Sequence, residues 1–118
     1  MKTNLSKLLD ADKTVMFAYL YGSYVEGTYT KRSDVDIAVY LNDTSLDARL
    51  TLHHKLEKAL SKDVDLLVLN EAKNLNLLEN ILRKGVVLAD HGRRALFEVQ
   101  KQHEIIDFKN FRRYIDAA

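Results

Sequence analysis

Apolar residues are grouped along the chain in short runs that alternate with longer segments in which they recur every three or four positions. The runs at residues 15–21, 34–41, 64–70 and 86–89 are rich in Val, Leu, Ile and Tyr and predict four β-strands. The segments 4–11, 45–61, 74–84 and 93 to about 115 have the spacing of amphipathic helices. Strands that alternate with helices predict an α/β fold, with helices packed on a small mixed β-sheet.

The helix predicted over residues 45–61 has a polar start and one apolar stripe. Ser45 is the expected N-cap, because its hydroxyl can accept a hydrogen bond from the first turn. The stripe expected to face the core consists of Leu46, Leu50, His53, Leu56 and Leu60.

The last predicted helix has two apolar stripes, and a break is expected near Asp107. One stripe contains Phe97, Phe108, Phe111 and Ile115. The other contains Leu96, Val99 and Ile106. One stripe can serve the core, while the second is expected either to bind a protein partner or to pack against the first helix.

Length, charge and cysteine content exclude several classes of protein. A chain of 118 residues is expected to form a single domain over residues 1–118. With 18 Lys and Arg against 17 Asp and Glu, no overall field favours nucleic acid or an anionic membrane, so neither is expected as a direct partner. Cysteine is absent, which excludes disulfides and thiolate chemistry. Neither a signal sequence nor an apolar span is found, so a soluble cytoplasmic protein is expected.

Two aspartates, Asp34 and Asp36, interrupt the apolar run of the second predicted strand. Side chains alternate faces along a strand, so both carboxylates are expected on the face opposite Val35 and Ile37. At about 4 Å and an effective dielectric constant near 20, two carboxylates repel by about 4 kcal/mol, so a nearby cation is expected. The alternative is a solvated strand end, where screening removes the repulsion.

A third carboxylate is expected from the strand at residues 64–70. Asp65 lies between Val64 and Leu66, whereas the competing Asp63 lies nearer the preceding loop, beside Lys62. Asp65 is therefore expected to meet the aspartate pair across neighbouring strands, and Asp63 to be solvated. Three oxygen donors at a sheet end suit Mg²⁺, which takes a few carboxylates together with water and substrate phosphates.

Gly22 and Ser23 directly follow the first predicted strand. A turn of this composition can offer backbone N–H groups and a hydroxyl to phosphates, and glycine permits a close approach of the backbone. Tyr24 follows and is a candidate lining residue of a nucleotide pocket. A Gly-Ser pair alone is an ordinary turn more often than a phosphate site. The prediction therefore depends on the ordered set of Gly-Ser, ten residues, Asp-x-Asp and a later strand aspartate.

This ordered set resembles the nucleotidyltransferase superfamily related to DNA polymerase β, whose minimal members carry G-S, ten residues and D-x-D. The similarity covers "GSYVEGTYTKRSDVDIAV", which includes Gly27 and Ser33. It continues more loosely through "VDLLVLN", "ILRKGVVLADHGRRALFE" and "IIDFKNFRRY". With this last pattern, the chain is similar to the MntA-like minimal nucleotidyltransferase antitoxins, the partners of HEPN-domain toxins.

The resemblance implies a polymerase beta-like nucleotidyltransferase fold and an enzyme that transfers AMP from ATP to a tyrosine of a HEPN ribonuclease toxin. It assigns phosphate binding to Gly22 and Ser23 and two Mg²⁺ ions to Asp34 and Asp36. It further implies that Asp65 shares one of these ions and accepts the proton of the attacking hydroxyl.

One position departs from the family pattern. The resemblance also leaves open which molecule accepts the AMP. The family commonly carries an arginine where this chain has Glu26, so Lys31 or Arg32 is a candidate replacement. The alternatives for function are a small-molecule nucleotidyltransferase and a non-catalytic antitoxin that acts by binding alone. Both are less favoured, since an acceptor pocket needs additional chain, and a binding module has no need for adjacent like charges.

Overall fold

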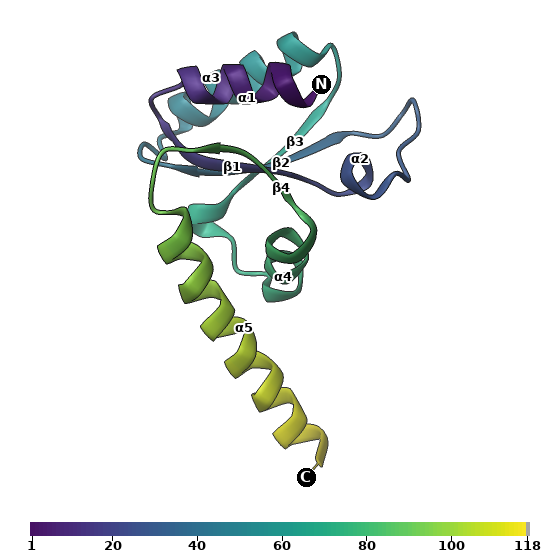
Figure 1. Ribbon diagram of the computed structural model, residues 1–118, viewed down its shortest axis with the longest axis vertical. Helices are drawn as coiled ribbons and strands as arrows, with labels where there is room; N and C mark the ends of the chain where they lie inside the picture. Colours follow the sequence, from purple (N-terminus) through teal and green to yellow (C-terminus); the bar gives the residue numbers. More distant parts are fainter. Residues whose placement is uncertain (118) are drawn as a thin grey trace.

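Four strands form one mixed sheet across the middle of the molecule in the computed structural model, which describes residues 1–117 (Figure 1). They are β1 (Val15–Tyr21), β2 (Val35–Leu41), β3 (Val64–Val68) and β4 (Val86–Asp90), arranged in the order β3-β2-β1-β4. β1 pairs antiparallel with both β2 and β4, whereas β2 and β3 are parallel. β1 and β2 occupy the centre and are covered on both faces, which explains their nearly continuous apolar sequences.

Two layers of helices cover the sheet, one on each face (Figure 1). α1 (Lys2–Ala11) and α3 (Leu46–Leu60) bury leucines against the alternate residues Val35, Ile37 and Val39 of β2. α4 (Leu75–Lys84) and the first half of α5 (Arg94–Ala117) pack on the other face, over side chains that include Tyr19, Tyr21 and Ala38. A one-turn helix, α2 (Ser23–Glu26), follows β1, and a 3-10 turn (Leu69–Glu71) follows β3.

α3 begins as predicted, but only the second half of its predicted core stripe, which includes Leu56 and Leu60, packs on the core. The Ser45 hydroxyl accepts a hydrogen bond from the Ala48 N–H, which confirms the N-cap. The buried residues are Leu52 and Leu56, while Leu46 is 69% exposed and Leu50 is 56% exposed. The predicted core stripe was therefore wrong at its start, because the helix turns the row containing Leu52 and Leu56 toward the sheet.

α5 is one continuous helix, so the break expected near Asp107 is absent from it. Phe97 and Ile105 are buried against α4 and the sheet, but beyond them the helix leaves the body of the molecule (Figure 1). Its exposed apolar residues are Leu96, Val99, Ile106, Phe111, Tyr114 and Ile115. The second apolar stripe of α5 does not pack against α1, because the two helices lie on opposite faces of the sheet (Figure 1). The expectation of such packing was wrong.

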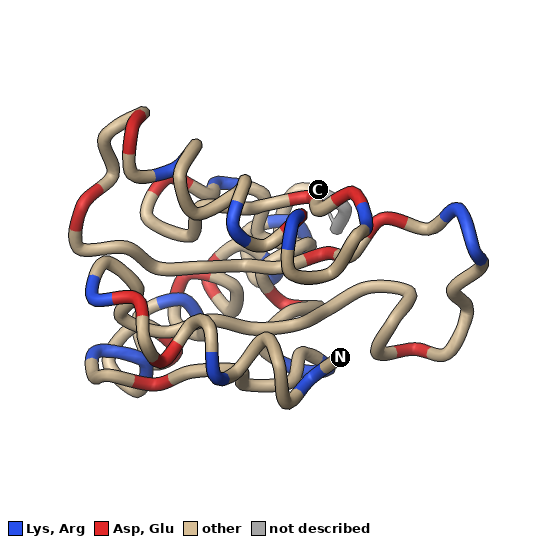
Figure 2. Tube along the Cα trace, turned by 90° about the horizontal axis from the view of Figure 1, so that it is seen from above, with Lys and Arg blue, Asp and Glu red and all other residues tan. Residues whose placement is uncertain are grey.

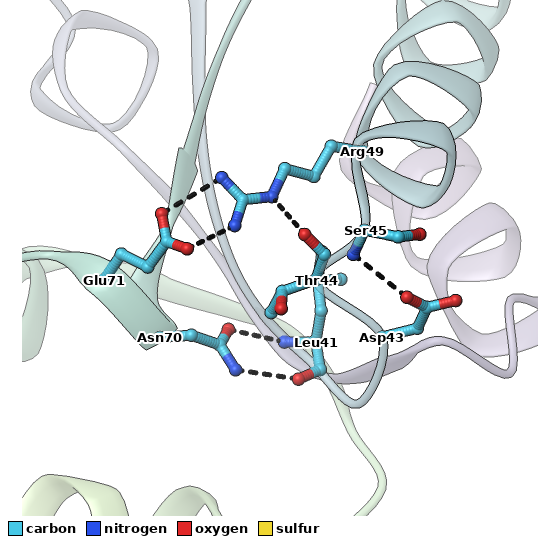
Figure 3. Close-up of polar contacts among 7 residues, drawn as sticks. All are labelled: Leu41, Asp43, Thr44, Ser45, Arg49, Asn70 and Glu71. Carbon is cyan, nitrogen blue, oxygen red and sulfur yellow. Dashed lines mark hydrogen bonds and ion pairs between the residues drawn. The ribbon is translucent and has the colours of Figure 1, made fainter.

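The carboxyl ends of β2 and β3 are closed by polar contacts that hold loops in place (Figure 3). The Asn70 side chain accepts a hydrogen bond from the Leu41 N–H at 2.9 Å and donates one to the Leu41 carbonyl at 2.8 Å. Arg49 forms an ion pair with Glu71 and donates to the Thr44 carbonyl. These contacts fix the loops that follow β2 and β3 at this end of the sheet.

None of the helices formed by residues 1–117 combines the length and the apolar character needed to cross a lipid bilayer.

Candidate active site

The amino ends of β2 and β3 bring the candidate site residues together. Asp36 is the register partner of Asp65 on β3 and of Tyr21 on β1. Register partners project from the same face of a sheet, so these three side chains form a row across three strands. Ala38 and Leu67 follow two residues later along β2 and β3 and pack under α4. The row therefore lies on the α4 face.

Asp34 and Asp63 lie outside this row. Asp34 precedes β2 and is exposed. Asp63 is also exposed, and its carbonyl accepts a hydrogen bond from the Val35 N–H at 3.0 Å. The expectation that Asp65 rather than Asp63 reaches across to Asp36 is thus confirmed by the register of β2 and β3.

Burial and like charges shape the electrostatics of the row. Burial raises the pKa of Asp36, and the carboxylates of Asp65 and Asp34 raise it further. The pKa of Tyr21 is also raised, first by burial and then by Asp36 and Asp65, so its hydroxyl remains protonated. The ionised form of Asp36 is disfavoured here, and a cation bound beside it would relieve the repulsion.

Gly22 lies directly against Asp36, and only glycine fits at this position without displacing the Asp36 side chain. Its φ of 76° is in the left-handed region, and a β-carbon placed there would overlap the Asp36 carboxylate. The Gly22 carbonyl accepts the Val25 and Glu26 N–H groups, which folds α2 and places Ser23 at its first position. The predicted Gly-Ser turn and the Asp-x-Asp strand are therefore in contact.

Asp34, Asp36 and Asp65 do not form a closed metal site by themselves, and a metal bound there would need further ligands. In the described part of the chain, no three Asp, Glu or His side chains are already gathered into a metal-binding cluster. Asp34 directly precedes β2, two residues before Asp36, and its carboxylate is close enough to raise the Asp36 pKa. A metal site shared by the three carboxylates therefore stays a prediction. Mg²⁺ commonly takes one or two carboxylates and completes its shell with water and phosphates, so Asp36 with its neighbours fits this use.

The loop between α2 and β2 projects beyond the sheet and carries basic residues at its tip (Figure 2). Ser33 holds the loop, since its hydroxyl accepts a hydrogen bond from the Thr30 N–H at 2.8 Å. Lys31 and Arg32 border a small polar cavity that Asp34 also lines. Lys31 or Arg32 therefore stays a candidate to replace the arginine that the family commonly carries at the position of Glu26.

Tyr24 lines a cavity, but not on the face of the aspartates. It packs against the core beneath α1, and its ring stacks on that of Tyr29 with centroids 4.6 Å apart. The cavity of about 660 Å³ beside it is also lined by Leu20 and Lys62. Tyr24 and the Tyr21-Asp36-Asp65 row thus lie on opposite faces of the sheet.

Sequence reasoning missed one residue beside the aspartates and one ion pair of α2. Tyr21 was read only as part of a buried strand, although the parity of β1 and its position before Gly22 place it beside Asp36. Lys84, at the end of α4, was also missed, and its ammonium lies 2.9 Å from the Glu26 carboxylate. No sequence signal links residues so far apart in the chain.

Comparison with known proteins gives a family, a curated relative and several solved structures. Residues 3–94 match the family described as "Polymerase beta, Nucleotidyltransferase". The protein adenylyltransferase MntA of Shewanella oneidensis strain MR-1 is 35% identical over 116 residues, which cover 96% of this chain and 76% of the relative.

Two solved structures illustrate the structural similarity. A crystal structure of a toxin-antitoxin with AMP-PNP matches with a TM-score of 0.77 and 33% identity, covering 98% of this chain and 95% of that one. The tri-AMPylated Shewanella oneidensis HEPN toxin in complex with MNT antitoxin matches with a TM-score of 0.71 and 30% identity, covering 99% and 97%.

Proposed function

Because the chain belongs to the polymerase beta nucleotidyltransferase family and is a homologue of the protein adenylyltransferase MntA, we propose that it is the antitoxin of a HEPN-domain toxin. It neutralises this toxin by transferring AMP from ATP to a toxin tyrosine. The observation that carries the proposal is the contact of Gly22 with Asp36, in register with Asp65. The related complexes with AMP-PNP and with an AMPylated HEPN toxin support the donor and the acceptor.

Gly22, Ser23, Asp34 and Asp36 bind the donor nucleotide. Gly22 lets the backbone approach the phosphates, and Ser23 contributes its hydroxyl and N–H. Asp34 and Asp36 would hold two Mg²⁺ ions, and Asp65 would share one of them. Bound there, Mg²⁺ would supply activation of the attacking hydroxyl and neutralisation of the charge that develops on the pyrophosphate.

Asp65 acts on the acceptor. The tyrosine oxygen forms a bond to the α-phosphorus of ATP while the bond from that phosphorus to the bridging oxygen breaks and pyrophosphate leaves. A free tyrosine hydroxyl has a pKa of about 10, so at neutral pH its proton must be removed with help. The Asp65 carboxylate is exposed at the edge strand and accepts this proton.

The toxin binds along the exposed apolar residues of α5. Phe111 and Ile115 lie beyond the part of the helix that packs on the sheet and are more than half exposed. Exposed aromatic and aliphatic side chains of this kind are typical anchors of protein interfaces. Residues 1–118 then act as a single minimal nucleotidyltransferase domain, in the cytoplasm where ATP is available.

The test is a transfer assay with a purified HEPN-domain toxin. ATP labelled at the α-phosphate should label the toxin in the presence of Mg²⁺, whereas ATP labelled at the γ-phosphate should not. Ser23→Ala should lower the rate at limiting ATP without preventing folding. Label from the γ-phosphate would indicate a kinase instead. A stable complex without any label would indicate an antitoxin that acts by binding alone.

A further inference from the structure

An ion pair joins the phosphate-binding turn to the helix that covers the candidate active site. The Lys84 ammonium at the end of α4 lies 2.9 Å from the Glu26 carboxylate on α2. Leu20 on β1 pairs with Val86 on β4, so the chain at Lys84 meets the end of β1, next to Gly22. The pair therefore lies at the same end of the sheet as the aspartates.

The Lys84 ammonium contacts Glu26, which lies one turn along α2 from Ser23. Ser23 and Glu26 are three residues apart in α2, so their side chains are neighbours on one face, with β-carbons about 5–6 Å apart. α4 covers the face of the sheet that carries Tyr21 and Asp36. Lys84 thus comes from the helix on the aspartate side of the sheet and pairs with the short helix that begins with Ser23.

The ion pair leaves its cation accessible to a ligand. The Lys84 side chain is 47% exposed and that of Glu26 is 37% exposed, so the pair is stabilised only weakly in water. A triphosphate carries several negative charges and is a stronger partner for an ammonium than one solvated carboxylate. Three aspartates border the site, so an additional cation lowers the electrostatic cost of bringing the triphosphate to them.

We propose that Lys84 binds the triphosphate of ATP, exchanging Glu26 for the β- or γ-phosphate when the nucleotide enters. This inference rests on the proposed function, because it concerns the same nucleotide site. Glu26 holds the ammonium near Ser23 in the free enzyme and competes with the ligand for it. Lys84 is therefore a binding residue, and Glu26 is the counter-ion that it leaves.

The test measures binding of Mg²⁺-ATP and of AMP by calorimetry, together with AMP transfer. Lys84→Met removes the charge but keeps the length of the side chain, and it should weaken ATP binding about tenfold, as expected for one charge-assisted hydrogen bond. AMP binding should not change, because AMP lacks the β- and γ-phosphates. Lys84→Arg should retain most of the ATP affinity. Arg83→Met removes the adjacent cation of α4 and should bind ATP like the parent.

Glu26→Gln separates phosphate binding from a purely structural brace. The variant should bind ATP about two- to fivefold more tightly, because the ammonium no longer has a competing carboxylate. If the pair only holds α2 in place, Lys84→Met and Glu26→Gln should weaken ATP and AMP binding alike, and that result overturns the inference. Equal ATP affinity of Lys84→Met and the parent also overturns it. Failure of the parent itself to bind ATP or transfer AMP refutes the proposed function instead.

Discussion

The Asp36 carboxylate lies so close to the Gly22 α-carbon that a β-carbon at position 22 would be 3.1 Å from Asp36 Cγ and would overlap the carboxylate oxygen. Two segments that the sequence separates by a long polar loop are therefore in direct contact. The contact sets the position of Ser23, the next residue, relative to the carboxylate row on β2 and β3. Substitutions at Gly22 and at Asp36 are therefore expected to change stability and AMP transfer in different ways.

Gly22→Ala should cost stability and abolish AMP transfer, whereas Gly27→Ala should cost stability alone. Both glycines have positive φ, at 76° and 79°, so each substitution adds backbone strain of about 1–2 kcal/mol. Only Gly22 has a neighbour within 4 Å of its β-carbon position, and that neighbour is Asp36. Chemical denaturation and the transfer assay would measure both effects. Equal transfer by the two variants would show that the contact with Asp36 has no role in positioning the site.

Asp36→Asn should stabilise the metal-free protein at neutral pH. Its folded-state pKa is raised, so the folded state binds the proton more tightly than the unfolded state, and ionisation above the usual carboxyl pKa costs stability. Removing this charge should add about 1 kcal/mol or less, which corresponds to a rise in Tm of about 3–5 °C. The gain should shrink as the pH falls from the raised pKa of Asp36 toward the usual carboxyl pKa, and it should be absent below that usual value. A gain that is instead independent of pH would show that the buried, repelled charge of Asp36 is not its cause.

Asp65→Asn should lower AMP transfer by about a hundredfold or more while Mg²⁺-ATP still binds, because general-base catalysis commonly contributes that much. Asp63→Asn is the matched control, since Asp63 is exposed and its carbonyl, not its side chain, contacts β2. Calorimetry would give the ATP affinity and intact-mass analysis of the toxin would give the rate. Normal transfer by Asp65→Asn, together with loss of transfer in Asp63→Asn, would show that Asp63 and not Asp65 accepts the proton.

Phe111→Asp with Ile115→Asp should weaken the complex with the toxin by about tenfold or more, because charges would enter an apolar contact. Both side chains are exposed, so the melting temperature of the free protein should hardly change. Leu46→Asp with Leu50→Asp on α3 is the control, since these leucines are equally exposed on the opposite layer. If the α3 variant loses the toxin and the α5 variant retains it, the interface lies on α3.

The fold could be predicted from the sequence because its strands are short apolar runs and its helices have regular spacing. The mixed sheet, with the polymerase beta-type nucleotidyltransferase fold, is confirmed, and so is the N-cap at Ser45. The helix faces were less predictable. Leu46 and Leu50 have the right spacing for a core stripe, but which side of α3 meets the sheet depends on tertiary packing. α5 is continuous through Asp107, where the sequence pattern predicted a break.

The site could be predicted only where its residues follow the alternation of a strand. The pairing of Asp36 with Asp65 depends on β2 and β3 being parallel neighbours, which their apolar runs make plausible. The contacts of Tyr21 with this pair and of Lys84 with Glu26 arise from the order of strands in the sheet. Such contacts between distant segments leave no local pattern in the sequence.

The most direct test of the account is AMP transfer from Mg²⁺-ATP to the toxin, measured by intact mass, for the parent, Asp36→Asn and Asp47→Asn. Asp47 is an exposed aspartate in the first turn of α3, away from the site, and serves as the control. We predict that the parent and Asp47→Asn increase the mass of the toxin by one or more AMP units. Asp36→Asn should leave the mass unchanged while remaining folded. Transfer by folded Asp36→Asn at the parent's rate would contradict the account.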